Sequence, residues 1–135
     1  MRLRPIVSER FSILGVVENG TCDADEFLFK GEAAEDRSRS SLRQKLRFIA
    51  RSGFQNVSTT WSHEVDKPHQ IYELIQGQIR LFYFKGVDGH IAVCTGGGRK
   101  KGRKADPHMV ARAVRLKREY FATIAAGTLR IEEQS

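Results

Sequence analysis

The basic residues of this chain are concentrated in one segment. Nine of its 23 Lys and Arg residues fall within residues 99–118, where they are accompanied by one acidic residue, Asp106. This segment carries +8, whereas the rest of the chain carries −1. A surplus confined to one segment is typical of a protein that binds phosphates, because a solubilising charge would be spread over the surface. The sequence therefore predicts one phosphate-binding patch.

A basic loop forms the first part of this segment and contains Arg99, Lys100, Lys101, Arg103 and Lys104. We predict that the loop holds a nucleic-acid backbone, since phosphate contacts contribute affinity without sequence choice. Glycines 96–98 precede it and would let the backbone approach a ligand closely, although a turn out of a strand needs them equally. His108 follows, at a helix N-terminus that favours bound anions. The alternative for the loop is a solvated run of charge.

Arg80 is the best single candidate for contact with a reacting phosphate. Its planar guanidinium can pair with two phosphate oxygens and stays charged. It stands between Ile79 and Leu81 in an apolar run, where an unpaired charge would be costly. The alternative is a cross-strand ion pair with Glu73, and both descriptions hold if the site is empty.

Histidines could supply proton transfer, because an imidazole with its ordinary pKa of about 6.5 can act as acid or base near neutral pH. His63 and His69 both precede the apolar run that contains Arg80. Neither the four histidines nor Cys22 and Cys94 show the spacing of a metal site, so we predict no metal and no cofactor. Both cysteines are expected to be reduced core residues.

Length and composition favour a single domain over residues 1–135. The chain has 40% hydrophobic residues, which is ordinary for a globular protein and is enough for one core. No apolar run approaches the roughly 20 residues that span a bilayer, and the N-terminus lacks the apolar core of a signal peptide. We therefore expect a cytoplasmic protein without a membrane partner.

The first half of the chain predicts one strand and two helices. Apolar residues predict an opening strand within residues 6–17. Asp23 and Glu26 have the spacing of a capping box and predict a short helix. Apolar residues at helical spacing predict an amphipathic helix over residues 35–52, with Gly53 at its end.

The second half predicts a sheet followed by a helix. A loop with an edge strand near residues 56–60 comes first, and three apolar runs then form an antiparallel meander at 71–75, 78–84 and 91–95. The three glycines are expected to end the last strand. Asp106 and Pro107 predict the start of a final helix over residues 107–126, which Gly127 ends. The fold class is therefore α+β: a small antiparallel sheet, made of the opening strand plus the meander, packed by two N-terminal helices, with a C-terminal helix.

Several short motifs occur in a recognisable order: Ile71-Tyr-Glu-Leu74, then Ile79-Arg-Leu-Phe-Tyr-Phe84, then Lys100-Lys101 before a terminal helix with Lys117-Arg-Glu-Tyr120. Over roughly residues 42–121 this order resembles the RelE/ParE toxin superfamily, and within it the phage-derived, HigB-like branch of type II toxin-antitoxin systems. Ile75 departs from the arginine that is frequent there, the basic loop is longer, and the first helix matches poorly.

The resemblance implies a RelE-like fold and a small ribonuclease that cuts mRNA, often on the ribosome. The RNA's own 2′-hydroxyl would attack the neighbouring phosphate without a metal, which requires a base, an acid and cations around the phosphorane. We expect the catalytic residues to be Arg80, Lys100, Lys101, His63 and Lys67, and the RNA-binding residues to be Arg99, Arg103, Lys104 and His108. A cognate antitoxin is the expected protein partner, since an open basic groove would otherwise bind nucleic acid non-specifically.

Two other functions stay open at this point. A ParE-like toxin binds gyrase and is not a nuclease, and the loss of an arginine at Ile75 favours it. The basic loop opposes it, because the cores of protein interfaces are depleted in lysine. A phage-derived nucleic-acid-binding protein would keep the patch but lack an acid and a base. The discriminating observation is whether Arg80 and the loop cations meet on one concave surface together with a histidine or tyrosine.

Overall fold

Eight strands form one mostly antiparallel sheet in residues 1–133, the part of the chain that this computed structural model describes. The strands are β1 (Arg2–Ser8), β2 (Ser12–Glu18), β3 (Thr21–Cys22), β4 (Ser62–Asp66), β5 (Ile71–Gln76), β6 (Ile79–Phe84), β7 (His90–Arg99) and β8 (Arg130–Ile131). Their order is β4-β5-β6-β7-β2-β1-β8, with β3 paired to β2. The β2–β7 and β1–β8 pairs are parallel and the others are antiparallel. The expected α+β class is confirmed.

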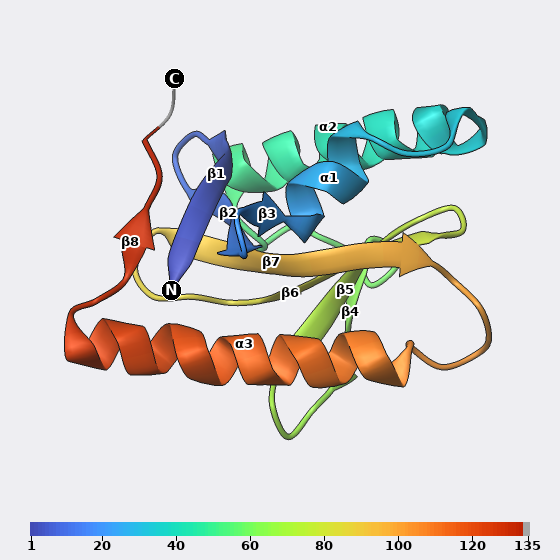
Figure 1. The fold of residues 1–135 in the computed structure, drawn as a ribbon. Coiled ribbons are helices and arrows are strands. Elements are labelled where there is room, and N and C mark those ends of the chain that lie inside the picture. The colour runs from blue at the N-terminus through green and yellow to red at the C-terminus, as the bar shows by residue number, and fades with distance from the viewer. Residues whose placement is uncertain (134–135) are drawn as a thin grey trace.

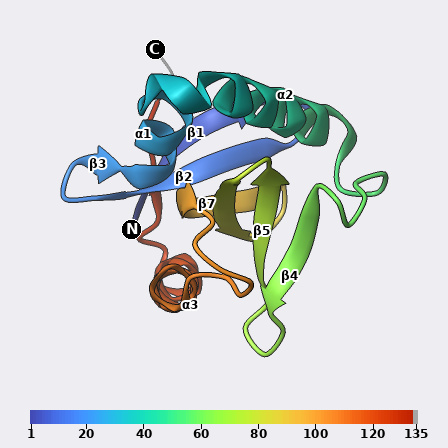
Figure 2. The ribbon, with the colours of Figure 1, turned by 90° about the vertical axis from the view of Figure 1, so that its right-hand side faces the viewer.

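Helices cover both faces of this sheet, as Figures 1 and 2 show. One face carries α1 (Asp23–Phe29) and α2 (Asp36–Ser52), which are joined by the short 3-10 helix η1 (Ala33–Glu35), and the other carries α3 (Pro107–Ala126). Each face buries its own apolar cluster. Leu42, Leu46 and Ile49 of α2 pack with Leu74 and Leu81 of the sheet on the first. Phe84 and Val93 pack with Leu116 and Tyr120 of α3 on the second.

The helices lie where the sequence places them. The predicted helices over residues 35–52 and 107–126 are confirmed as α2 and α3. Asp106 caps α3 by accepting a hydrogen bond from the backbone N–H of His108, and Gly127 ends it in the left-handed conformation. The capping box is wrong: α1 exists, but its N-cap is Cys22 and no side chain caps it.

Three strand predictions need correction. The single opening strand is an antiparallel pair, β1 and β2, because the chain reverses around Glu9 and Arg10. The edge strand is β4, later in the sequence than residues 56–60. The third strand of the meander does not end at the glycines: β7 runs through them to Arg99 and stays paired with β6. The antiparallel order of the meander itself is confirmed.

One glycine in β7, Gly97, is needed for packing between α1 and the sheet. A Cβ on Gly97 would stand 2.4 Å from Cδ2 of Phe27, so only glycine lets α1 lie this close to the strand. A Cβ on Gly98 would meet nothing within 4 Å.

Cys22 and Cys94 are buried and unbridged core residues, as expected.

Within residues 1–133, no helix combines the length and the apolar character needed to cross a membrane. The same residues contain no group of three or more His, Cys, Asp or Glu side chains placed to hold a metal ion.

Candidate active site

A pocket of about 520 Å³ lies between the sheet and the segment that leads into α3. Strands β4, β5, β6 and β7 contribute its floor, and residues 99–109 contribute its walls. The charged and histidine side chains in the lining are His63, Glu73, Arg80, Arg99, Lys100, Lys101, Arg103, Lys104, Asp106 and His108. Eight of the nine residues that the sequence analysis selected for the site therefore line one cavity.

Strand register brings the floor residues together. His63 lies opposite Glu73 across the β4–β5 pair, and Glu73 lies opposite Phe82 across β5–β6. Arg80 is two residues from Phe82 along β6 and so projects from the same face. The side chains of the neighbouring Leu74 and Leu81 project from the opposite face of the sheet, where they pack against α2. The period-two alternation of the strands thus separates the core from the polar floor of the pocket.

Glu73 is the centre of this floor. Its Oε1 lies 3.0 Å from Nε2 of His63 and 3.6 Å from Nε of Arg80. The glutamate side chain is only 7% exposed, whereas that of His63 is 46% exposed. The second carboxylate oxygen, Oε2, is buried and makes no hydrogen bond within the described residues. A buried carboxylate oxygen without a donor is costly, and such groups are frequent at functional sites, so Glu73 is a candidate functional residue.

Arg80 is held from two sides. Its Nη1 donates to the backbone carbonyls of Gly77 at 2.9 Å and Ile79 at 3.0 Å, while Nε faces Glu73. The predicted cross-strand pair with Glu73 is therefore confirmed. The contacts in the described structure leave Nη2 free to donate to a ligand, and the 12% exposure of the side chain shows that the group is largely enclosed.

The cations of residues 99–118 divide into two groups. On α3, Arg112 and Arg115 pair with Glu18, Arg112 also pairs with Asp23, and Lys117 donates to the carbonyl of His69. Glu18 has a lowered pKa because Arg115 and Arg112 stabilise its charged form. Four loop cations, by contrast, have no acidic partner in residues 1–133: Lys100, Lys101, Arg103 and Lys104. Arg99 pairs with Glu35 at 3.7 Å. Five cations of this segment thus have no ion-pair or hydrogen-bond partner for their side chain in the described residues; four of them line the pocket, and the fifth is Arg118 of α3.

The N-terminus of α3 meets the same pocket. Pro107, His108 and Met109 line it, and these residues begin the 20-residue helix α3. The orphan N–H groups and the dipole of a helix start favour an anion there. The Asp106 carboxylate already accepts from the N–H of His108, so this N–H is not available to a ligand and Asp106 offsets part of the positive field.

Lys67 and three aromatic residues lie outside this lining. Lys67 is exposed in the turn between β4 and β5 and is not part of this lining. Trp61 packs edge-on against Phe48 of α2. Tyr83 and Tyr120 are core residues, and burial raises the pKa of both hydroxyls. The Tyr83 hydroxyl lies 2.7 Å from that of Ser62 and so fastens the start of the edge strand β4 that carries His63.

From the sequence, Glu73 is predicted only as an ion-pair partner of Arg80. The structure places it in contact with both His63 and Arg80, so it connects two side chains that were selected independently. The signal that could have found it is its position: a carboxylate in the middle of an apolar strand, flanked by Tyr72 and Leu74, needs a buried partner.

Chemically, the pocket combines a histidine that is oriented by a carboxylate, an enclosed arginine and a wall of free lysines. A histidine hydrogen-bonded to a carboxylate is a common arrangement for proton transfer, because the carboxylate fixes the ring and stabilises its protonated form. Arginine and lysine stabilise negative charge that develops on a phosphate. No model of a known protein family matches this chain, and no curated protein matches it either. The site is therefore interpreted from its own geometry.

Proposed function

We propose that this protein is the toxin of a type II toxin-antitoxin system, a RelE-like, HigB-like endoribonuclease that cleaves mRNA without a metal. One observation carries the proposal: His63, Glu73 and Arg80 share the floor of a cavity whose walls include four unpaired loop cations, Lys100, Lys101, Arg103 and Lys104. A gyrase-binding surface has no need of an enclosed acid–base pair. A plain nucleic-acid binder has no need of one either.

In the proposed reaction, the 2′-oxygen of the RNA bonds to the adjacent phosphorus and the bond from phosphorus to the 5′-oxygen breaks. His63 donates through Nε2 to Glu73, which leaves Nδ1 as the acceptor of the 2′-hydroxyl proton. A second group must protonate the 5′-oxygen, and His108 is the other histidine in the pocket. The products are a 2′,3′-cyclic phosphate and a 5′-hydroxyl.

Cations stabilise the charge on the phosphate and bind the RNA backbone. Arg80 donates through Nη2 to the phosphate, where charge accumulates as the phosphorane forms. Lys100 and Lys101 lie in the wall of the same pocket and share the catalytic role, while Arg99, Arg103 and Lys104 hold the flanking backbone.

We also propose that a cognate antitoxin with an acidic or amphipathic segment covers these cations in the resting cell. Calorimetry at physiological salt with the product of the neighbouring reading frame tests this partner, and absence of binding would contradict it.

The function is tested by mapping 5′ ends of cellular transcripts after brief induction of the protein. New ends inside translated regions are expected for the unchanged chain and for Lys67→Ala, whose lysine lies outside the pocket. The double variant Arg80→Ala, Lys100→Ala should produce none. Growth arrest with unchanged transcripts would contradict the proposal in favour of a gyrase-type target. Unchanged transcripts with normal growth would leave a binding protein.

A further inference from the structure

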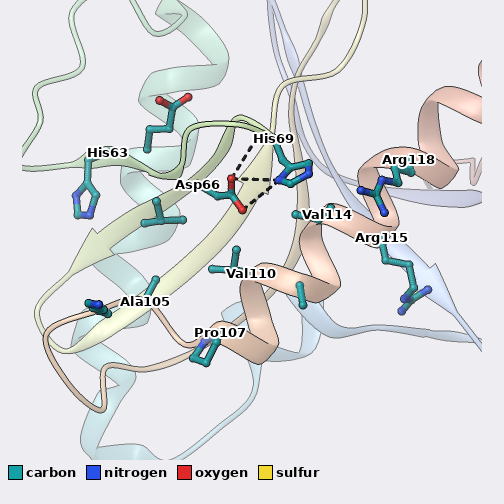
Figure 3. Close-up of a pocket in the computed structure, with 13 residues that line it drawn as sticks. His63, Asp66, His69, Ala105, Pro107, Val110, Val114, Arg115 and Arg118 are labelled. Carbon is teal, nitrogen blue, oxygen red and sulfur yellow. Dashed lines mark hydrogen bonds and ion pairs between the residues drawn. The ribbon is translucent and has the colours of Figure 1, made fainter.

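A second cavity, of about 710 Å³, continues from the proposed active site along α3. It lies between the edge strand β4 and α3, and Figure 3 shows its lining. We call it the β4–α3 groove. Four residues line both cavities: His63, Lys104, Ala105 and Pro107. A polynucleotide that places one phosphate beside Arg80 can therefore pass His63 and enter the groove.

The groove has apolar walls suited to the face of a base. Val110 and Val114 of α3 point toward β4 (Figure 3), and Val65 and Ala111 complete the apolar lining. Its volume lies in the range of roughly 300–1,000 Å³ that is common for ligand sites. Proteins that bind unpaired RNA hold splayed bases on such surfaces and read their Watson–Crick edges.

The lining includes two carboxylates, Glu64 and, opposite Ile71 on the face that carries α3, Asp66. Asp66 is 21% exposed and faces His69, whose backbone N–H donates to Oδ1 at 3.2 Å and whose Nδ1 lies 3.2 Å from Oδ1 and 3.3 Å from Oδ2. A carboxylate in a groove next to Lys104 and Arg118 weakens the binding of phosphate. As a pure acceptor, however, it can bind the N–H groups of a base.

The fold directs Asp66 into the groove. The β4–β5 register shifts at a bulge between Glu64 and Asp66, so that Asp66 lies opposite Ile71, on the face that carries α3. Bulges at sheet edges commonly redirect a side chain in this way. Lys117 then fastens the following turn to α3 by donating to the carbonyl of His69 at 2.6 Å. The carboxylate is therefore preorganised.

We propose that the β4–α3 groove binds the base of a nucleotide next to the cleavage site, and that Asp66 selects guanine. This inference rests on the proposed function. Guanine alone among the four RNA bases carries two neighbouring N–H donors on its Watson–Crick edge, at N1 and N2, and these match the two oxygens of a carboxylate. Arg118 and Lys104 have no acidic partner in the described residues and are placed to hold the phosphates at either end.

Mononucleotide binding tests this without any need for cleavage. Methyl NMR of the valines, with titrations of 5′-GMP, 5′-IMP and 5′-AMP, reports on Val110 and Val114. GMP should shift both valines and bind about tenfold or more tightly than IMP, which lacks the N2 amino group, as expected for one hydrogen bond to a charged acceptor. Asp66→Asn should abolish this preference. Asp88→Asn, the same change in the β6–β7 loop outside the lining of the groove, should retain it.

The outcomes separate the subsite from the proposed function. Equal binding of all three nucleotides at the valines would overturn guanine selection. Shifts of the ring signals of His63 and His108, recorded in the same titrations, without shifts of the valine methyl groups would overturn the subsite and leave the phosphate pocket standing. The cleavage assays on wild-type protein decide the proposed function independently of either result.

Discussion

His63 on the edge strand β4 faces Glu73 on β5, with Nε2 of the histidine 3.0 Å from Oε1 of the glutamate. The same oxygen faces Arg80 at 3.6 Å. One buried carboxylate thus orients both the proposed base and the proposed phosphate ligand. Because Glu73 acts through these two side chains, it is a positioning residue in this account.

Glu73→Gln should therefore reduce cleavage far more than stability. The amide keeps the shape of the side chain but removes the charge that fixes the histidine, so kcat should fall by about 10²-fold or more with a nearly unchanged KM. Single-turnover kinetics and circular dichroism measure the two effects. Glu32→Gln, an exposed position on the approach to η1, is the matched control and should have full activity. Wild-type kcat in Glu73→Gln would contradict the assigned role.

The unpaired loop cations predict a strong salt dependence of RNA binding. Lys100→Ala should lower the slope of log K against log salt concentration by about 0.7, the value for one phosphate of a single strand. Fluorescence anisotropy with a 2′-O-methyl RNA, which the protein cannot cleave, measures this slope between low and physiological salt. Lys67→Ala removes the same charge outside the pocket and should leave the slope unchanged. Equal effects of the two variants on the slope would contradict a specific contact between the loop and an RNA phosphate.

Gly97 and Gly98 should differ sharply when replaced by alanine. A Cβ at Gly97 overlaps the ring of Phe27, so α1 must move, and the free energy of unfolding should fall by about 1–3 kcal/mol. Gly98→Ala meets nothing and should be close to neutral. Urea unfolding monitored by fluorescence compares them. Equal stabilities would mean that α1 does not require a glycine at residue 97.

His90 makes stability depend on pH. Burial lowers its pKa from the ordinary value of 6.5, and the charge of Asp88 opposes this shift only partly. The unfolded chain therefore binds more protons than the folded chain as pH falls below 6.5. The contribution of His90 is complete above that pH and is lost as pH falls through the lower folded value. Urea unfolding from pH 7 to pH 5 should show the decline.

The control for this effect is His90→Asn. Asparagine can keep a hydrogen bond to the hydroxyl of Tyr120, which lies 3.0 Å from Nδ1 of the histidine, but it does not titrate. This variant should show a smaller decline of stability over the same interval. An unchanged decline would assign the effect to other groups.

Local signals predicted the helices well. Asp106 and Pro107 at one end and Gly127 at the other fix α3, since capping chemistry depends on neighbouring residues alone. The end of β7 was mispredicted because glycine was taken as a strand breaker. At Gly97 the glycine instead provides room for Phe27, a contact between residues 70 positions apart that no local pattern contains.

Part of the site was predictable in the same way. The loop cations and Arg80 follow from composition and from the cost of a charge in an apolar strand, and the structure brings them into one pocket. The role of Glu73 depends on the register of three strands, which alternation alone does not determine. Lys67 was selected by resemblance, and the β4–β5 turn carries it away from the pocket.

The most direct test of the central claim is the chemistry of the RNA ends produced by the purified protein. We would incubate it with an mRNA, alone and on ribosomes, in the presence of EDTA for the free RNA, and analyse the fragments by mass spectrometry. The account predicts 2′,3′-cyclic phosphate and 5′-hydroxyl ends, lost when the ribose at the cleavage site is 2′-deoxy and lost in His63→Ala. Ends carrying 3′-hydroxyl and 5′-phosphate, or cleavage that survives the 2′-deoxy substitution, would contradict it.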